Sequence, residues 1–557
     1  MRTLTLPVCV LLALATAGAQ ENPDLSVINR IKSEEFQNSK VMEHLEYLTD
    51  VYGPRLTGSP EFKEAADWAL KRLESYGLVN GHLEKWGPFG RSWTPRQYAL
   101  EMLQPRYALL DAAPLAWSRN TNGPVAGDVI LAPLPARTFD PVQAEKDLDA
   151  YIAKYKGKLR GKIVLISNEI RTGVSSENRP LLRRYTDAEL ASIAAAPEPV
   201  LRHEFAPNEP IKFPEDPMER LEYMASLPQS VRDELRERGQ RVLNRRSQFF
   251  NDEGVVALLQ DDGRAHDALI FAEQAGSRKA GDPEAPPTFV VTKEQYDRLL
   301  HLVRLKQPVR LQANLRAEQS REDVDSYNII AEIPGATRPD EVVMVGAHFD
   351  SWHTGTGATD NGAGSAVMME VVRILKALNL KMDRTVRIGL WGGEEEGLLG
   401  SEAYVKEHFG DPKTMRLTSA HAKLSGYYNL DNGSGKIRGV YLQGNDAMRP
   451  LFERWLAPFR DLGVTTITIR NTGGTDHLSF DAVGLPGFQF IQDPLDYFTV
   501  THHSDMDTYD HAVAGDLMQA SAVIASLVYD TANMREMLPR KALPKPQQSE
   551  HPTSTRD

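Results

Sequence analysis

The sequence predicts an α/β protein with a mixed, mostly parallel central sheet flanked by helices. Three observations lead to this fold class. The apolar, β-branched run 341–348 has the length and composition of a buried strand. Residues 366–378 then carry apolar side chains at helical spacing, and a second apolar run follows at 385–391. A strand, a helix and a strand in this order form the unit from which parallel sheets are built.

The same alternation continues on both sides of this unit. Strands are predicted at 326–333, 425–430, 465–470 and 487–491, and helices at 26–52, 59–77, 447–459 and 514–529. Ser59 is expected to cap the second of these helices, because Pro60 follows at the first helical position and Gly77 closes the pattern.

Between Arg119 and Glu322 the pattern changes to short strand-like runs joined by glycine and proline. These runs lie at 125–132, 161–168, 254–259, 268–272 and 287–291. A charged, helix-prone segment at 185–250 separates the second run from the third, and its Arg- and Glu-rich part, 232–246, is interpreted as a solvated helix face.

These patterns divide the chain into an expected series of segments. They are a signal peptide at 1–19, the first part of the α/β domain at 20–118, a β-rich insert with a charged helical segment at 119–322, the rest of the α/β domain at 323–538 and a disordered tail at 539–557. The tail is assigned from its richness in Pro, Gln, Ser and Thr.

Length and charge limit the classes of function. A chain of 557 residues, 41% hydrophobic and 25% charged, is too long for one core. Its net charge of −12 argues against nucleic acid as a partner and against stable association with a membrane surface.

The first residues have the features of a secretory signal. A basic start, an apolar run at 4–15 and small residues at 17–19 fit a cleaved signal peptide, since the apolar run is shorter than the ~20 residues that span a bilayer. The only cysteine, Cys9, lies inside it. We therefore expect a secreted or periplasmic protein without disulfides or thiolate metal sites.

Polar side chains gather at the carboxyl ends of the two central strands. His348 and Asp350 follow the first strand, Asp360 lies in the glycine-rich loop before the helix, and Glu394 and Glu395 follow the second strand. Ligands of open α/β sheets bind at this edge. The sequence therefore predicts a site there.

Two later strands end in further candidates. Asp431 follows the strand at 425–430, and His502 and His503 come after the strand at 487–491. An aspartate that ends a strand is more often a turn residue, and a single histidine is more often a core or surface residue. What favours a site is that all these residues fall at the same edge of one predicted sheet.

The combination of side chains fits two divalent cations. Asp360, Glu395 and Asp431 supply carboxylates, and His348 and His503 supply neutral nitrogens. A mixed N/O set of this kind suits zinc in a catalytic site.

Three residues remain for other roles. If Glu395 faces a metal, Glu394 is free to act as a general base, because adjacent residues leaving a strand point in different directions. Asp350 is placed to accept a hydrogen bond from the imidazole of His348 and so to fix its tautomer. Tyr497 is a candidate substrate-binding residue, with ordinary packing as the alternative.

These residues resemble the co-catalytic di-zinc exopeptidases, a family that includes bacterial leucyl aminopeptidases and glutamate carboxypeptidases. The matching motifs, in order, are His348-Phe349-Asp350, Asp360-Asn361-Gly362, Gly393-Glu394-Glu395, Asp431 and His503. The resemblance implies the zinc exopeptidase fold with an inserted protease-associated domain, and two zinc ions per chain.

The resemblance also implies how the ligands are divided. Asp360 would bridge the two zinc ions, His348 and Asp431 would complete one, and Glu395 and His503 the other. His503 is preferred over its neighbour because an Asp-Thr pair, at 507–508, follows it at the spacing that the family shows after its ligand.

The function implied is a secreted zinc exopeptidase in which Glu394 is the general base. It would hydrolyse bonds at a peptide terminus or in dipeptides, as an aminopeptidase or a carboxypeptidase, and the sequence leaves a homodimer open. A glutaminyl cyclase-like enzyme with one zinc and a receptor-like relative that has lost its ligands are the alternatives. The full set of five ligands speaks against both, and the metal stoichiometry would decide.

Overall fold

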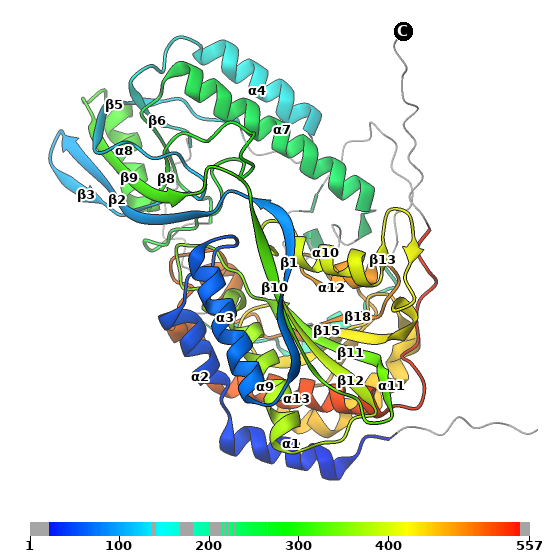
Figure 1. Cartoon of the computed structure of the whole chain (residues 1–557). Coiled ribbons are helices and arrows are strands. Elements are labelled where there is room, and N and C mark those ends of the chain that lie inside the picture. The colour runs from blue at the N-terminus through cyan, green and yellow to red at the C-terminus, as the bar shows by residue number, and fades with distance from the viewer. Residues whose placement is uncertain are drawn as a thin grey trace, which may run out of the picture.

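The computed structural model of the chain contains, in its described part, two eight-stranded sheets, each with its own helices, and a small sheet formed by β13 (Gly410–Asp411) and β14 (Arg416–Leu417) (Figure 1). It describes residues 22–135, 141–167, 182–199, 213–214, 219–220, 223, 226–227, 229–264 and 266–545. The expected signal peptide at 1–19 lies outside these residues. Within the described part, no helix is both long enough and apolar enough to cross a bilayer.

The first sheet confirms the mixed, mostly parallel arrangement that the sequence predicts. Its four central strands run parallel, and β1, β10 and β16 are antiparallel to their inner neighbours. In spatial order the strands are β1 (Val79–Gly90), β10 (Val324–Ile333), β12 (Arg384–Trp391), β11 (Arg338–His348), β15 (Leu424–Asn429), β18 (Gly487–Gln492), β16 (Ile437–Tyr441) and β17 (Thr466–Thr468).

Helices bury both faces of this sheet. One face is covered by α1 (Leu25–Asn38), α2 (Val41–Glu46), α3 (Pro60–Ser75), α9 (Ala363–Ala377), α11 (Arg449–Trp455) and α13 (Ala514–Asn533), and the other by α10 (Leu399–His408) and α12 (His477–Asp481). Side chains of β11 alternate accordingly: Val343 and Val345 pack with the first group, and Val342 and Met344 with the second. Burial on both sides explains why these strands are continuous apolar runs.

Two strands of this sheet carry no clear pattern in the sequence. The edge strand β1 contains Gly81, Gly87 and Pro88, which are poor strand formers, and it is held by its antiparallel pairing with β10. The short strand β16 lies between β18 and β17 and is set by its neighbours.

The second sheet contains most of the short strands predicted between 119 and 322. In spatial order it comprises β3 (Ala108–Leu110), β2 (Trp93–Gln104), β9 (Arg310–Gln319), β5 (Val125–Leu131), β6 (Lys162–Leu165), β7 (Ala257–Gln260), β8 (Thr288–Val291) and β4 (Ala112–Pro114). Its helices are α4 (Pro141–Tyr155), α7 (Gln229–Glu253) and α8 (Lys293–Arg304), and α7 contains the charged run. Three of its strands precede Arg119, so this sheet draws on residues from both sides of that boundary.

Two parts of the middle region pack against the α/β domain instead. Helix α5 (Asp187–Ala194) contacts β17. The run at 268–272, predicted as a strand, does not join the second sheet, because its backbone pairs with a loop of the α/β domain at Phe271 and Ser504.

The two sheets are connected through two antiparallel strand pairs. The chain passes from β1 into β2 and returns from β9 into β10, and β1 pairs with β10 as β2 pairs with β9. The second sheet is thereby attached by two adjacent connections, as Figure 1 shows.

The segment after Leu538, predicted to be a disordered tail, begins with residues that contact the α/β domain. Arg540 donates hydrogen bonds to the carbonyl oxygens of His421 and Leu424, and Lys541 donates to that of Gln443. Arg540 and Lys541 are thus held against the α/β domain, because each cation contacts carbonyl groups there.

A buried arginine fixes the loop that follows β11. Arg55 is fully buried and donates to the backbone oxygens of Leu48, Phe349, Thr356 and Gly357 over 2.7 to 3.0 Å. Burial lowers its pKa to about 10, which still leaves the guanidinium charged at neutral pH. One side chain thus satisfies three carbonyl groups of the irregular loop after β11 and a fourth, that of Leu48, in the helical turn Tyr47–Val51.

We expect Arg55→Met to lower the free energy of unfolding by roughly 3 kcal/mol, because several buried carbonyl groups would lose their donor. Denaturant unfolding of the purified protein measures this difference. The control is Arg30→Met, since Arg30 also donates to a carbonyl group, that of Leu378, but is exposed. An equal effect of the two substitutions would contradict the role given to Arg55.

Candidate metal centre

The loops after three neighbouring parallel strands converge at one edge of the first sheet. β11 ends at His348, which is paired with Trp391 at the end of β12. Glu394 and Glu395 follow β12, and Asp431 follows β15 on the other side of β11. The order β12, β11, β15 therefore brings these residues together at one edge, as the sequence predicts.

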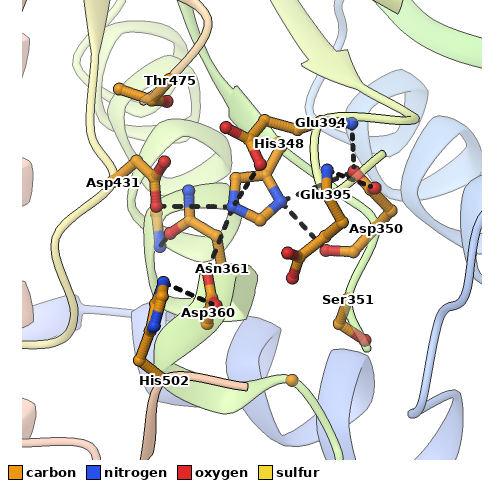
Figure 2. Close-up of polar contacts among 12 residues, drawn as sticks. His348, Asp350, Ser351, Asp360, Asn361, Glu394, Glu395, Asp431, Thr475 and His502 are labelled. Atoms are coloured by element: carbon orange, nitrogen blue, oxygen red, sulfur yellow. Dashed lines mark hydrogen bonds and ion pairs between the residues drawn. The ribbon is translucent and has the colours of Figure 1, made fainter. Parts of the chain in front are cut away.

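His348 lies at the centre of this group (Figure 2). Its Nε2 atom is 3.3 Å from Asp360 Oδ1, 3.4 Å from Asp431 Oδ1 and 4.0 Å from Glu394 Oε2. Its Nδ1 atom is 3.1 Å from the backbone oxygen of Asp350. Because Nδ1 faces an acceptor, the neutral ring keeps its proton there and Nε2 is free to bind a cation.

The carboxylate of Asp350 has a different role from the one expected. Its nearer oxygen is 3.5 Å from His348 Nδ1, farther than the carbonyl oxygen of the same residue. The carboxylate instead accepts hydrogen bonds from the backbone N–H groups of Glu394 and Glu395, at 3.3 and 3.2 Å, and from Thr57 Oγ1 at 2.9 Å. It thus fixes the loop that carries both glutamates (Figure 2).

Asp360 is held from several sides. Its backbone leaves the helical conformation, with φ −130° and ψ 87°, and its peptide bond to Asn361 is cis. The carboxylate of Asp507 accepts hydrogen bonds from the N–H groups of Thr359, at 2.6 Å, and of Asp360, at 3.2 Å. The hydroxyl of Tyr497 donates to Asp360 Oδ1 over 3.0 Å. The Asp360 carboxylate is therefore fixed before any ion binds.

The second histidine approaches the opposite oxygen of Asp360. His503 Nε2 is 3.4 Å from Asp360 Oδ2 and 3.0 Å from Glu395 Oε2. His502 Nε2 is farther from the same Asp360 oxygen, at 3.9 Å, and the two imidazole rings are stacked with centroids 3.7 Å apart. The distances thus favour His503 over His502 as the partner of Glu395.

Two groups of described residues can hold a cation, and both include Asp360. One consists of His348, Asp360 and Asp431, the other of Asp360, His502 and His503, and the candidate ligand atoms of each group lie within 4.8 Å of one another. Since zinc binds nitrogen and oxygen ligands at about 2.0 to 2.2 Å, this spacing admits one ion between the atoms of a group.

The hydrogen bonding of the site supports the same fit. His348 Nε2, Asp360 Oδ2, Glu395 Oε1 and Asp431 Oδ1 are buried and have no hydrogen-bond partner. Buried polar atoms are rarely left in this condition, because each costs about 1 to 3 kcal/mol. Cations bound beside His348 and beside Glu395 would give these atoms partners.

Burial and mutual repulsion raise the pKa of the two neighbouring glutamates. Burial raises the pKa of Glu394 well above its usual range, and the carboxylates of Asp431, Asp476 and Glu395 raise it further. Burial and the charge of Asp360 raise the pKa of Glu395 to about 8. Burial and the neighbouring carboxylates thus favour the protonated form of both side chains.

The imidazoles respond to the same carboxylates in the opposite sense. Burial lowers the pKa of His348, but the charges of Asp431 and Glu394 outweigh it, so the pKa lies well above the usual value. The pKa of His503 is raised in the same way by Glu395 and Glu273. The site therefore attracts positive charge, as protons or as metal ions.

Three contributors were not predicted from the sequence. Asp507 and Thr57 hold the backbone of the site, and Glu273 Oε1 lies 2.8 Å from His503 Nδ1. Asp507 has a weak signal, since it follows His503 in the Asp-Thr pair. Thr57 and Glu273 carry none, because each comes from a distant segment.

Comparison with known proteins identifies the family. Residues 328–528, which include all the candidate ligands, match the model of peptidase family M28. The match thus covers most of the α/β domain that follows the second sheet. Family M28 consists of co-catalytic zinc exopeptidases, so the resemblance predicted from the sequence is confirmed, and the class of enzyme that the match supports is a zinc-dependent peptidase.

The similarity extends beyond that domain. Carboxypeptidase Q of Mus musculus is 27% identical over 517 residues, which are 92% of this chain and 90% of that protein. The crystal structure of a peptidase M28 precursor from Shewanella amazonensis has a TM-score of 0.63 at 24% identity, covering 93% of this chain and 98% of that one. A zinc aminopeptidase from Bacillus subtilis has a TM-score of 0.52 at 19% identity, covering 89% and 95%. The structural matches confirm the zinc exopeptidase fold.

We expect Asp360→Ala to lose both zinc ions and His348→Ala to lose one, because only Asp360 belongs to both groups of candidate ligands. Metal analysis of the purified variants, with the unsubstituted protein expected to contain close to two zinc ions, measures this difference. Asp446→Ala, at an exposed aspartate paired with Arg449, is the control and should keep the full content. Retention of both ions by Asp360→Ala would exclude a bridging role.

Proposed function

We propose that the chain is a di-zinc exopeptidase that removes residues from the carboxyl end of short peptides and splits dipeptides. The observation that carries this proposal is the position of Asp360, whose two carboxylate oxygens face histidines on opposite sides. A carboxylate so placed is suited to bridge two ions.

The proposed ligands divide as the geometry suggests. His348 and Asp431 complete one ion and Glu395 and His503 the other, with Asp360 shared between them. A glutaminyl cyclase-like enzyme would need one zinc and a receptor-like relative none. The presence of all five side chains around two sites favours the exopeptidase over both.

Glu394 is the proposed general base. Zinc at such a site polarises the scissile carbonyl group and lowers the pKa of water. Glu394 lies beside His348, with its Oε2 atom 4.0 Å from Nε2, whereas Glu395 Oε2 lies 3.0 Å from His503 Nε2. Its carboxylate takes the proton of the attacking water and returns it to the leaving amine.

Tyr497 is less free to bind substrate than the sequence suggests. Its hydroxyl group is buried and donates to Asp360 Oδ1, so its proton is directed at the proposed bridging carboxylate. We therefore assign Tyr497 first to orienting Asp360, and contact with substrate would require that hydrogen bond to open.

The carboxyl terminus is the end of the substrate that the comparisons favour. The similarity to carboxypeptidase Q extends over nearly the whole length of both proteins, including the second sheet. The likeness to the zinc aminopeptidase is one of fold. An aminopeptidase is therefore kept as the second candidate.

We further infer export and a role for the second sheet in substrate choice. The export proposal is supported by the signal-like residues 1–19 and by the absence of cysteine after Cys9. The second sheet stands where the family resemblance implies a protease-associated domain, and we propose that it limits the substrates that reach the metal centre.

Replacing Glu394 tests the mechanism. We expect Glu394→Gln to retain zinc and substrate affinity while turnover falls by ~10²- to 10⁴-fold, since the amide keeps the shape but cannot accept the proton. Glu395→Gln should lose zinc instead. Metal content and kcat are measured for both, with Glu407→Gln, an exposed residue of α10, as the control. If only the Glu394 variant lost metal, Glu394 would be the zinc ligand and Glu395 the general base.

A substrate panel tests the proposed end of attack. We expect N-blocked dipeptides to be hydrolysed with kcat/KM at least roughly tenfold higher than aminoacyl anilides, because a carboxypeptidase does not need a free amino group. Peptides with an amidated carboxyl end serve as the control and should resist. Faster hydrolysis of the anilides would establish the aminopeptidase instead.

A further inference from the structure

The second sheet and the segments packed against it, here called the second domain, contribute one carboxylate to the candidate metal centre. The segment around Glu273 belongs to this domain, since Ile270 and Ala272 pack with Val290 of β8. Glu273 belongs to the segment between β7 and β8, yet its Oε1 atom is 2.8 Å from Nδ1 of His503, 230 residues away in the chain. The other nitrogen of that imidazole faces Asp360 and Glu395. One ring therefore joins the two domains through its two nitrogens.

Backbone contacts fix this arrangement. The segment of Glu273 runs antiparallel to the loop of His503, with a bridge between Phe271 and Ser504. The N–H group of Ala272 donates to the carbonyl oxygen of His503 over 3.2 Å, and the N–H of Asp505 donates to the carbonyl oxygen of Ile270 over 2.9 Å. The relative position of Glu273 and His503 is thus set by the main chain on both sides.

Further contacts connect the segment of Glu273 with the loop of His503. Leu269 and Phe271 form a small apolar cluster with Val500, and His266 Nε2 lies 3.1 Å from the carbonyl oxygen of Thr499. These contacts add to the bridge between Phe271 and Ser504. The position of Glu273 beside His503 is therefore held by several interactions and not by one flexible contact.

The conformation of His503 explains why it needs external support. Its φ of 64° lies in the left-handed region, which is sterically unfavourable for a residue with a side chain. The stacked ring of His502 and the edge-to-face ring of Trp352, with its centroid 6.0 Å away, limit its tilt. Neither ring accepts the Nδ1 proton, and Glu273 does.

We propose that Glu273 is a positioning residue for one of the two zinc ions. By accepting the Nδ1 proton it keeps the neutral tautomer in which Nε2 has a free lone pair directed at that ion. The inference rests on the proposed function, because it takes His503 as a zinc ligand. It adds that the second domain is part of the metal centre as well as a neighbour of it.

The other histidine ligand is oriented differently. His348 Nδ1 faces the carbonyl oxygen of Asp350, two residues away in the same loop. The ion at His348 and Asp431 therefore depends on the α/β domain alone. The ion at Glu395 and His503 depends on both domains, so a change at Glu273 should affect one ion and spare the other.

Zinc affinity of variants tests this asymmetry. We expect Glu273→Ala to weaken the binding of one zinc equivalent by ~10- to 100-fold, measured by competition with a chelator, while the second equivalent binds as in the unsubstituted protein. Glu273→Gln should lose less, because the amide oxygen still accepts the Nδ1 proton. Substitution of cobalt for zinc gives a spectroscopic readout of the same site that does not depend on activity.

The control is Glu318→Ala. Glu318 is a glutamate of β9 paired with Arg96, much as Glu273 Oε1 lies 3.6 Å from a nitrogen of Arg264. The control substitution should leave both equivalents unchanged, and all variants should unfold at the same temperature without metal. Unchanged binding of both equivalents in Glu273→Ala, or equal loss of both, would overturn the inference. A failure of the unsubstituted protein to bind zinc would instead reject the proposed function.

Discussion

The two carboxylate oxygens of Asp360 face two different imidazoles, and the contacts around Asp360 hold it in this orientation. His348 reaches one oxygen from the end of a central strand, and His503 reaches the other from a loop far along the chain. The carboxylate cannot turn toward either, because Tyr497 holds one oxygen and Asp507 holds the backbone. The candidate metal centre is thus preorganised by contacts that lie outside the ligands themselves.

Charge is the second consequence of this arrangement. Several carboxylates lie close together in a buried space. Burial and their mutual repulsion raise the pKa of Glu394 and Glu395. The same negative charges raise the pKa of His348 and His503. Bound cations would replace protons on these side chains, so metal affinity and proton release are linked.

The two domains are connected more closely than a simple insertion would require. Two strand pairs run from one sheet into the other (Figure 1). The loop of His503 also pairs with the segment that carries Glu273. The strand pairs fix the position of the second sheet, and the loop contact connects that position to His503, the proposed metal ligand.

The sequence by itself determined the central sheet and the residues at its carboxyl edge. Apolar runs specify β11, β12 and β15, and parallel pairing puts their carboxyl ends at one edge of the sheet. The sequence alone therefore predicts that His348, Glu394 and Asp431 lie close together. Only the tertiary structure decided which atoms orient them. A carbonyl oxygen holds His348, the carboxylate of Asp350 holds the glutamate loop, and Glu273 reaches His503 from another domain. Local periodicity reports burial along one segment, whereas these contacts depend on how separate segments pack, and no pattern within either segment encodes them.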